Sequence, residues 1–185
     1  MTITEDPWTS AAPESVGRKL VQVPAPVLEA LGDGDLEAAR SLSDQTLTPY
    51  MIHDECRSVW KYRSRQISLE PRDALWVTRL LVDTKTGEVL GRAGYHGQPN
   101  EDGMVEVGYS IDPLVRRQGH ARAALRILID MAREDPRVRA VRATIQPGNI
   151  ASTALVKQFG FCEVGEHWDD EYGRGLMAVL EVSVA

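Results

Sequence analysis

A six-residue run in the second half of the chain joins a strand pattern to a helix pattern. The run is Arg116-Arg117-Gln118-Gly119-His120-Ala121. Residues 105–113 alternate in polarity and stop at a proline, which indicates a strand. Residues 121–134 repeat apolar side chains at steps of three and four, as an amphipathic helix does. A small-residue turn that opens a helix presents free N–H groups and the positive end of the helix dipole, so this run suits a pyrophosphate.

The composition is that of an ordinary globular domain. The 185 residues are 43% hydrophobic and 26% charged, which is enough for one full core. A net charge of −6 argues against a nucleic-acid-binding protein. Basic charge gathers near the turn instead, which favours a small anionic ligand. The arginines in question are Arg116, Arg117, Arg122 and Arg126.

Cysteine content and apolar run lengths point to a cytoplasmic protein. Cys56 and Cys162 are too few for a disulfide framework and lack the spacing of metal ligands. No apolar run approaches 18 residues, so we expect no membrane span. Residues 1–17 carry acidic side chains and no apolar stretch, which predicts a flexible tail followed by one domain over residues 18–185.

The order of the remaining patterns predicts an α/β domain with a mixed sheet. A short strand at 19–23 precedes helical patterns at 24–31, 36–42 and 50–69. Turn signals divide a three-stranded meander at 76–83, 88–96 and 104–112. The rest is a helix at 119–134, a strand at 138–145, a helix at 150–159 and two closing strands at 161–167 and 176–184.

Three motifs, in this order and on these elements, resemble the GNAT (Gcn5-related N-acetyltransferase) superfamily. They are Val105 to Pro113 followed by Arg116, then Arg116-x-x-Gly119-x-Ala121, then Asn149-x-x-Ser152 with Leu155 and Gly160-Phe161. The resemblance runs from Trp76 to the end of the chain and is greatest to the RimJ/RimL-like branch. It implies a mostly antiparallel sheet of six to seven strands. It also implies a V-shaped splay between the strands at 104–112 and 138–145.

The resemblance further implies acetyl-CoA as co-substrate, an amine as acceptor and no metal. Backbone groups of Tyr109 and Ile111 would then pair with the pantetheine. The pyrophosphate contacts carry over to Arg116, Arg117, Gln118, Gly119, His120 and Ala121, mainly through N–H groups. We expect the His120 side chain to face solvent or the adenosine phosphates. Asn149 would cap its helix and contact the cofactor.

Two residues are candidates for proton transfer. Strand alternation places Glu106 on the sheet face opposite Val105 and Val107, where it could be the base that deprotonates the amine. It could equally hold a cationic substrate or be a solvated carboxylate. Ser152 could protonate the departing thiolate, or it could be a first-turn serine bonded to the backbone. His96, at the end of a strand, is an alternative base.

Two functional hypotheses follow. The first is an N-acetyltransferase that acts on a primary amine by direct attack in a ternary complex. The second is a catalytically silent domain that binds CoA or acyl-CoA as a sensor or interaction module. Neither the acceptor, the length of the acyl group nor a homodimer, which is common in the family, can be read from the sequence. The acidic and aromatic segment 168–172 could favour a cationic acceptor, or it could be a solvated turn.

Overall fold

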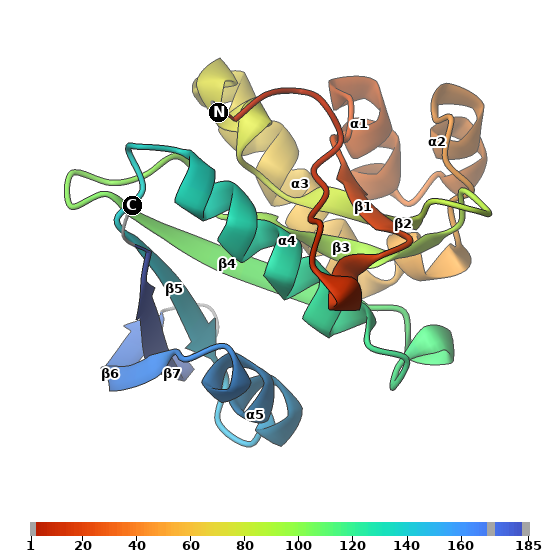
Figure 1. Cartoon of the computed structure of the whole chain (residues 1–185). Helices are drawn as coiled ribbons and strands as arrows, with labels where there is room; N and C mark the ends of the chain where they lie inside the picture. The colour runs from red at the N-terminus through yellow and green to blue at the C-terminus, as the bar shows by residue number, and fades with distance from the viewer. Residues whose placement is uncertain (1–2, 170–172, 183–185) are drawn as a thin grey trace.

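The computed structural model describes residues 3–169 and 173–182. Its centre is a seven-stranded sheet in the order β1-β2-β3-β4-β5-β7-β6 (Figure 1). All described neighbours pair antiparallel except β4 and β5, which are parallel. The predicted mixed, mostly antiparallel sheet is therefore confirmed. The strands are β1 (Arg18–Val21), β2 (Arg79–Asp83), β3 (Val89–Tyr95), β4 (Met104–Ile111), β5 (Ala140–Ile145), β6 (Cys162–Asp169) and β7 (Gly173–Glu181).

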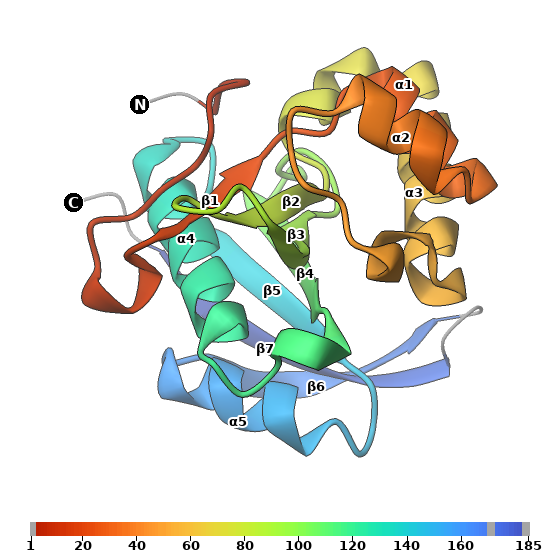
Figure 2. The same cartoon turned by 90° about the vertical axis from the view of Figure 1, so that its right-hand side faces the viewer.

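Helices cover both faces of this sheet (Figure 2). One buried cluster joins the sheet to α1, α2 and α3, and a second joins it to α4 and α5. The helices are α1 (Ala25–Asp33), α2 (Leu36–Leu42), α3 (Asp54–Leu69), α4 (His120–Glu134) and α5 (Ile150–Gln158). Short 3-10 turns lie at Pro13–Ser15, Pro49–Ile52, Pro71–Leu75 and Pro113–Val115.

Element boundaries differ from the sequence prediction where proline changes the local geometry. The helix predicted at 50–69 begins at Asp54, because Pro49 starts a separate 3-10 turn ahead of it. The strand predicted at 76–83 begins at Arg79, because Trp76 ends a 3-10 turn that starts at Pro71. The helix after the Gly119 turn, by contrast, lies at 120–134, within one residue of the prediction.

The chain ahead of β1, where the sequence predicts a flexible tail, packs against the domain at Ile3 and Trp8. Ile3 and Trp8 are almost fully buried, and Trp8 exchanges two backbone hydrogen bonds with Leu20 of β1. The buried guanidinium of Arg79 stacks on the Trp8 ring and donates to the carbonyls of Thr4 and Asp6. Two isolated apolar residues show no periodicity, so the sequence could not reveal this packing.

The sheet opens between β4 and β5. These strands pair over four residues only, from Met104 with Ala140 to Val107 with Ala143. Beyond Val107, β4 keeps its pairing with β3, while β5 continues beside β7. One backbone edge of β4 is thus unpaired with β5 from Gly108 onward, and the predicted V-shaped splay is confirmed.

Candidate active site

The turn that leads from β4 to α4 is held in one conformation by its own polar groups. Asp112 accepts a hydrogen bond from the Leu114 N–H at 3.0 Å and from Thr48 Oγ1 at 3.1 Å. Arg116 donates from Nε to the Ile111 carbonyl oxygen at 2.9 Å. Arg117 has a φ of 64°, the only positive φ outside glycine in the described residues. The turn is therefore a fixed platform at the open end of β4.

The N-terminus of α4 is left open by this platform. Its N-cap is Gly119, with φ 83°, and no side chain accepts from the first N–H groups of the helix. In α2 and α5 those groups are capped by Asp35 and Asn149. A Cβ built on Gly119 would meet no atom within 4 Å, so the backbone there is accessible. Exposed N–H groups at a helix N-terminus suit the phosphate groups of a nucleotide.

The His120 side chain is buried and does not face solvent, which was one of the two positions expected from the sequence. Only 5% of the residue is exposed, and Nδ1 is buried without a hydrogen-bond partner. Desolvation, followed by the charge of Arg18, lowers the pKa of this imidazole. At position 120, only the backbone N–H can therefore contribute to the phosphate site at the start of α4.

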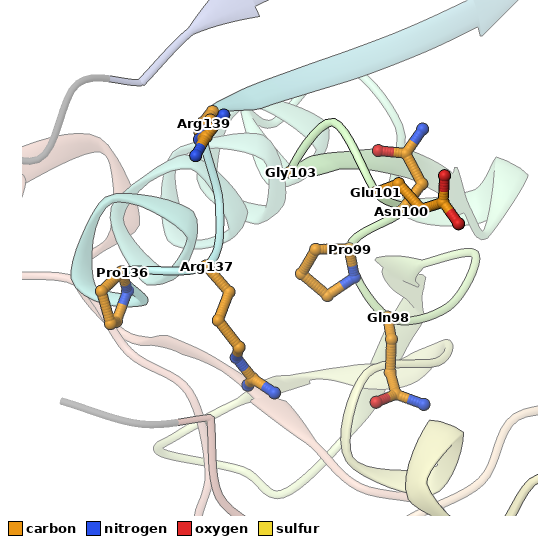
Figure 3. A pocket seen from close by; sticks show the side chains of 8 residues that line it. All are labelled: Gln98, Pro99, Asn100, Glu101, Gly103, Pro136, Arg137 and Arg139. Atoms are coloured by element: carbon orange, nitrogen blue, oxygen red, sulfur yellow. The ribbon is translucent and has the colours of Figure 1, made fainter.

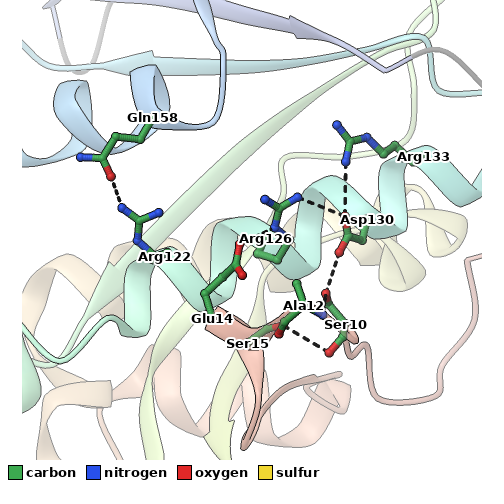
Figure 4. A network of polar contacts seen from close by, with 9 residues as sticks. All are labelled: Ser10, Ala12, Glu14, Ser15, Arg122, Arg126, Asp130, Arg133 and Gln158. Carbon is green, nitrogen blue, oxygen red and sulfur yellow. Dashed lines mark hydrogen bonds and ion pairs between the residues drawn. The ribbon is translucent and has the colours of Figure 1, made fainter.

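Besides Arg116, two more of the four clustered arginines, Arg122 and Arg126, are engaged within the protein. Arg126 donates to Glu14 at 2.8 Å and lies 3.6 Å from Asp130, and Arg122 bonds to Gln158 of α5 (Figure 4). The same network reaches the N-terminal segment, since Ser10 Oγ donates to Asp130 at 2.6 Å. Because their partners occupy Arg122 and Arg126, these side chains hold elements together rather than stand free for an anion.

Tyr109 and Ser152 meet where β4 approaches the first turn of α5. Burial raises the pKa of the Tyr109 phenol, and the Ser152 hydroxyl beside it acts in the opposite direction. The phenol oxygen is buried without a hydrogen-bond partner. Asn149 accepts from the Ser152 N–H at 3.1 Å, which confirms it as the N-cap of α5.

Glu106 lies on the other face of the sheet, as strand alternation predicted. Its Oε2 accepts two hydrogen bonds from Arg142 of β5, one of them from Nε at 2.8 Å. Its Oε1 lies 3.6 Å from His96 Nδ1. The Glu106 side chain is 17% exposed. This carboxylate is thus paired with a guanidinium and is not the solvated group that the sequence left open.

His96 follows β3 and lies across the point where β4 and β5 separate. A Cβ added to Gly108 would come within 2.8 Å of His96 Nε2, so only glycine permits this approach. Partial burial, with the Arg63 charge second, lowers the pKa of His96 to about 4 although 48% of the side chain is exposed. The imidazole is therefore neutral at pH 7.

A second polar cluster on the same face was not predicted from the sequence. Ser110 of β4 bonds to the Tyr50 hydroxyl at 2.5 Å and donates to Glu55 at 3.0 Å. Glu55 also pairs with Arg92 of β3 at 3.2 Å. These residues come from three separate segments, so no local pattern in the sequence indicates their association.

A cavity of about 330 Å³ lies away from the splay (Figure 3). It is at the opposite end of β4 and contains none of the predicted site residues. Its lining is Gln98, Pro99, Asn100, Glu101, Gly103, Pro136, Arg137 and Arg139.

Other candidate features were searched over residues 3–169 and 173–182. No group of three or more His, Cys, Asp or Glu side chains there could hold a metal ion. None of the helices there is long and apolar enough to cross a membrane. The acidic segment predicted at 168–172 contains residues 170–172, which lie outside the described residues.

A sheet that splits beside an uncapped helix N-terminus, with a carboxylate and an imidazole on the far face, is the arrangement that the sequence led us to expect of an acetyltransferase. The chain belongs to the GNAT acetyltransferase family, because residues 27–162 match the family's Acetyltransferase (GNAT) domain. It is therefore an enzyme of the acyl-CoA-dependent acetyltransferase type. The expected membership of the GNAT superfamily is confirmed, and the solved structures of RimL and RimJ share the fold.

Similar proteins share the fold over most of their length. An uncharacterized N-acetyltransferase, YjdG, from Bacillus subtilis is 24% identical over 156 residues, which are 83% of this chain and 90% of that protein. RimL, a ribosomal L7/L12 alpha-N-protein acetyltransferase solved with coenzyme A, gives a TM-score of 0.65 at 17% identity, over 94% of this chain and 98% of that one. The microcin C7 self-immunity acetyltransferase MccE, solved with acetyl-CoA and AMP, gives 0.63 at 12% identity, over 94% and 99%.

Proposed function

We propose that this protein is an N-acetyltransferase that moves the acetyl group of acetyl-CoA to a primary amine by direct attack in a ternary complex. The observation that carries the proposal is the coincidence of the splay with the open N-terminus of α4. The unpaired edge of β4 begins at Gly108, and the uncapped N–H groups begin just after Gly119. The two features suit, in that order, a pantetheine arm and a diphosphate.

The residues present fit such a donor. The N–H groups around Gly119 and Ala121 provide positive charge for the diphosphate, and Arg117 and Gln118 belong to the same turn. Beyond Gly108, the backbone of Tyr109 and Ile111 can pair with an extended arm as an added strand would. The Ile111 carbonyl already accepts from Arg116, so Arg116 acts through the shape of the turn as well as through its charge.

The chemistry divides between the two faces of the sheet. On the acceptor face, a base near Gly108 takes one proton from the amine's ammonium group. The amine nitrogen then bonds to the acetyl carbonyl carbon while the bond from that carbon to sulfur breaks. On the other face, the hydroxyl of Ser152 gives a proton to the leaving sulfur and regains one from the nitrogen. Tyr109, beside Ser152, can pass its own proton into the same exchange.

The acceptor that we propose is a primary amine. RimL and MccE have similar folds; the first is a ribosomal-protein acetyltransferase and the second a microcin self-immunity acetyltransferase. The fold is thus compatible with both protein and small-molecule acceptors. A test is a screen of peptide N-termini, polyamines and aminoglycosides with acetyl-CoA, read as thiol release and as mass gain of the acceptor.

A silent acyl-CoA-binding domain is the alternative. Both functions predict saturable CoA binding, so binding alone does not separate them. Thiol release that depends on an amine supports the enzyme. Binding of acetyl-CoA without thiol release across the whole screen would support the sensor.

A further inference from the structure

We propose that His96 is the base that deprotonates the amine, and that Glu106 and Arg142 hold it in position. The inference rests on the proposed function, because it assigns a residue to the acetyl transfer. It departs from the simplest expectation, in which the carboxylate of Glu106 accepts the proton itself. Three structural observations support it.

The first observation is how the two carboxylate oxygens of Glu106 are engaged. Its Oε2 receives both hydrogen bonds from Arg142, and its Oε1 faces His96 Nδ1 at 3.6 Å. The guanidinium therefore engages the Oε2 oxygen, which is not open to an acceptor ammonium. The remaining oxygen is directed at an imidazole rather than at the opening.

The second observation is the position of the imidazole. The last rung that joins β4 and β5 is Val107 with Ala143, and Gly108 is the next residue of β4. His96 Nε2 lies over Gly108, within 2.8 Å of where a Cβ would stand. The ring therefore reaches the apex of the splay, where the thioester of an inserted donor would lie. Glu106 is one rung before the apex.

The third observation is how firmly the backbone of His96 is held. Its N–H donates to the Glu106 carbonyl at 2.8 Å. Its own carbonyl accepts from Arg63 at 2.9 Å and from Gln66 at 2.8 Å, both on α3. Asp73 in turn accepts from Gln66 at 2.6 Å. The strand end is thus fixed from two sides, while the ring, about half exposed, remains accessible to an acceptor.

These contacts define the proton transfer. With Nδ1 protonated toward Glu106, Nε2 keeps its lone pair over Gly108. Nε2 takes one proton from the acceptor ammonium, directly or through a water, and later releases it to solvent. The amine that remains attacks the acetyl carbon as described above. The negative charge of Glu106 stabilises the imidazolium that forms, as a carboxylate partner does in other histidine bases.

Charged groups on four elements face the ring. Glu106 of β4 favours protonation, whereas Arg63 of α3, Arg92 of β3 and Arg142 of β5 disfavour it. The net effect lowers the pKa of His96 below its ordinary value, so the imidazole stays in its basic form well into the acidic range. The rate at saturating amine should therefore stay constant through neutral pH and fall only as the pH approaches about 4.

The test compares His96→Gln and Glu106→Gln in the full-length enzyme, with His53→Gln as a control for an exposed histidine at the start of α3. We expect His96→Gln to lower kcat by about 10²- to 10⁴-fold and to abolish the acidic limb of the pH profile. CoA affinity, measured by calorimetry, should be unchanged. Glu106→Gln should keep an acidic limb but move it to lower pH, because the loss of the carboxylate lowers the pKa of His96 further. His53→Gln should behave as wild type.

Gly108→Ala provides a second test of the position of the His96 ring. The added methyl group displaces the ring and changes no ionisable group, so kcat should fall while a limb remains. Nitrogen NMR of the unliganded wild type should show the His96 ring protonated on Nδ1 and unprotonated on Nε2. This readout needs no acceptor.

Several outcomes would overturn the proposal. One is a His96→Gln enzyme with wild-type kcat and an intact acidic limb. Another is a limb that vanishes in Glu106→Gln and persists in His96→Gln, which would make Glu106 the base. A neutral His96 ring protonated on Nε2 rather than on Nδ1 would also overturn the proposal. Failure of the proposed function is distinguishable, because the wild type would then bind CoA and release no thiol with any amine.

Discussion

At the scale of single residues, several side chains that look alike in the sequence have different roles in the fold. His96 and His120 both have lowered pKa values, but His96 reaches the splay whereas His120 is shut inside the protein. Gly108 and Gly119 likewise serve different needs. The first admits an imidazole at close range, and the second adopts a left-handed φ in open space.

Gly119→Glu should weaken CoA binding by at least about tenfold, or roughly 1.4 kcal/mol. The substitution places a negative charge at the open N-terminus of α4, where an anion is expected to bind. Gly119→Gln is the matched control, since glutamine has the size of glutamate at the same φ of 83° and adds no charge. Calorimetry with CoA measures both. Equal affinity of wild type and Gly119→Glu would contradict a diphosphate site at this turn.

Protonation of buried histidine should make the fold less stable in acid. The pKa of His120 is lower in the folded protein than in the unfolded chain, so the unfolded chain binds more protons below about pH 6.5. The free energy of unfolding should therefore fall as pH decreases from about 7 to 5. His120→Gln should reduce this slope, as measured by urea unfolding at each pH. An identical slope in the variant would show that other groups cause the effect.

At the scale of elements, the way each helix begins decides what it can do. In α5, the side chain of Asn149 accepts a hydrogen bond from an N–H group of the first turn. In α4, the N-cap is a glycine and no side chain accepts from the first turn. β4 shows the same contrast along its length. Its first half is paired on both sides, and its second half is paired with β3 alone.

Asn149→Ala should destabilise the protein by about 1 kcal/mol, because the Ser152 N–H loses its acceptor at the start of α5. Asn149→Asp keeps an acceptor and should recover most of this stability. Thermal or urea unfolding of the two variants provides the measurement. If Asn149→Asp matches wild type in stability but binds CoA less tightly, the asparagine side chain also contacts the cofactor, as the family resemblance implies.

At the scale of the whole molecule, the N-terminal segment is part of the domain's core. It pairs with β1 through Trp8 and contacts α4 through the bonds of Ser10 to Asp130 and of Glu14 to Arg126 (Figure 4). Its anchor is the pair of Trp8 and Arg79. Burial lowers the pKa of Arg79 to about 9, and its partners are backbone carbonyls rather than a carboxylate.

Trp8→Ala should cost about 3–5 kcal/mol of stability, because it removes a buried ring and opens the contact that covers the Arg79 guanidinium. Val16→Ala in the same segment is the control and should change stability by less than about 0.5 kcal/mol, since Val16 is 64% exposed. Chemical denaturation tests both. A Trp8→Ala protein as stable as wild type would contradict this packing role and support the flexible tail predicted from the sequence.

The sequence by itself determined the order of the elements, the fold class and the Gly119 turn, because each depends on residues close together in the chain. Periodicity, proline positions and capping residues act over a few residues and can be read directly. Only the tertiary structure decided what surrounds each side chain. The partners of Glu106 lie at positions 96 and 142, and Trp8 finds Arg79 across 71 positions. Such contacts arise from strand pairing and packing between distant segments, which leave no local pattern.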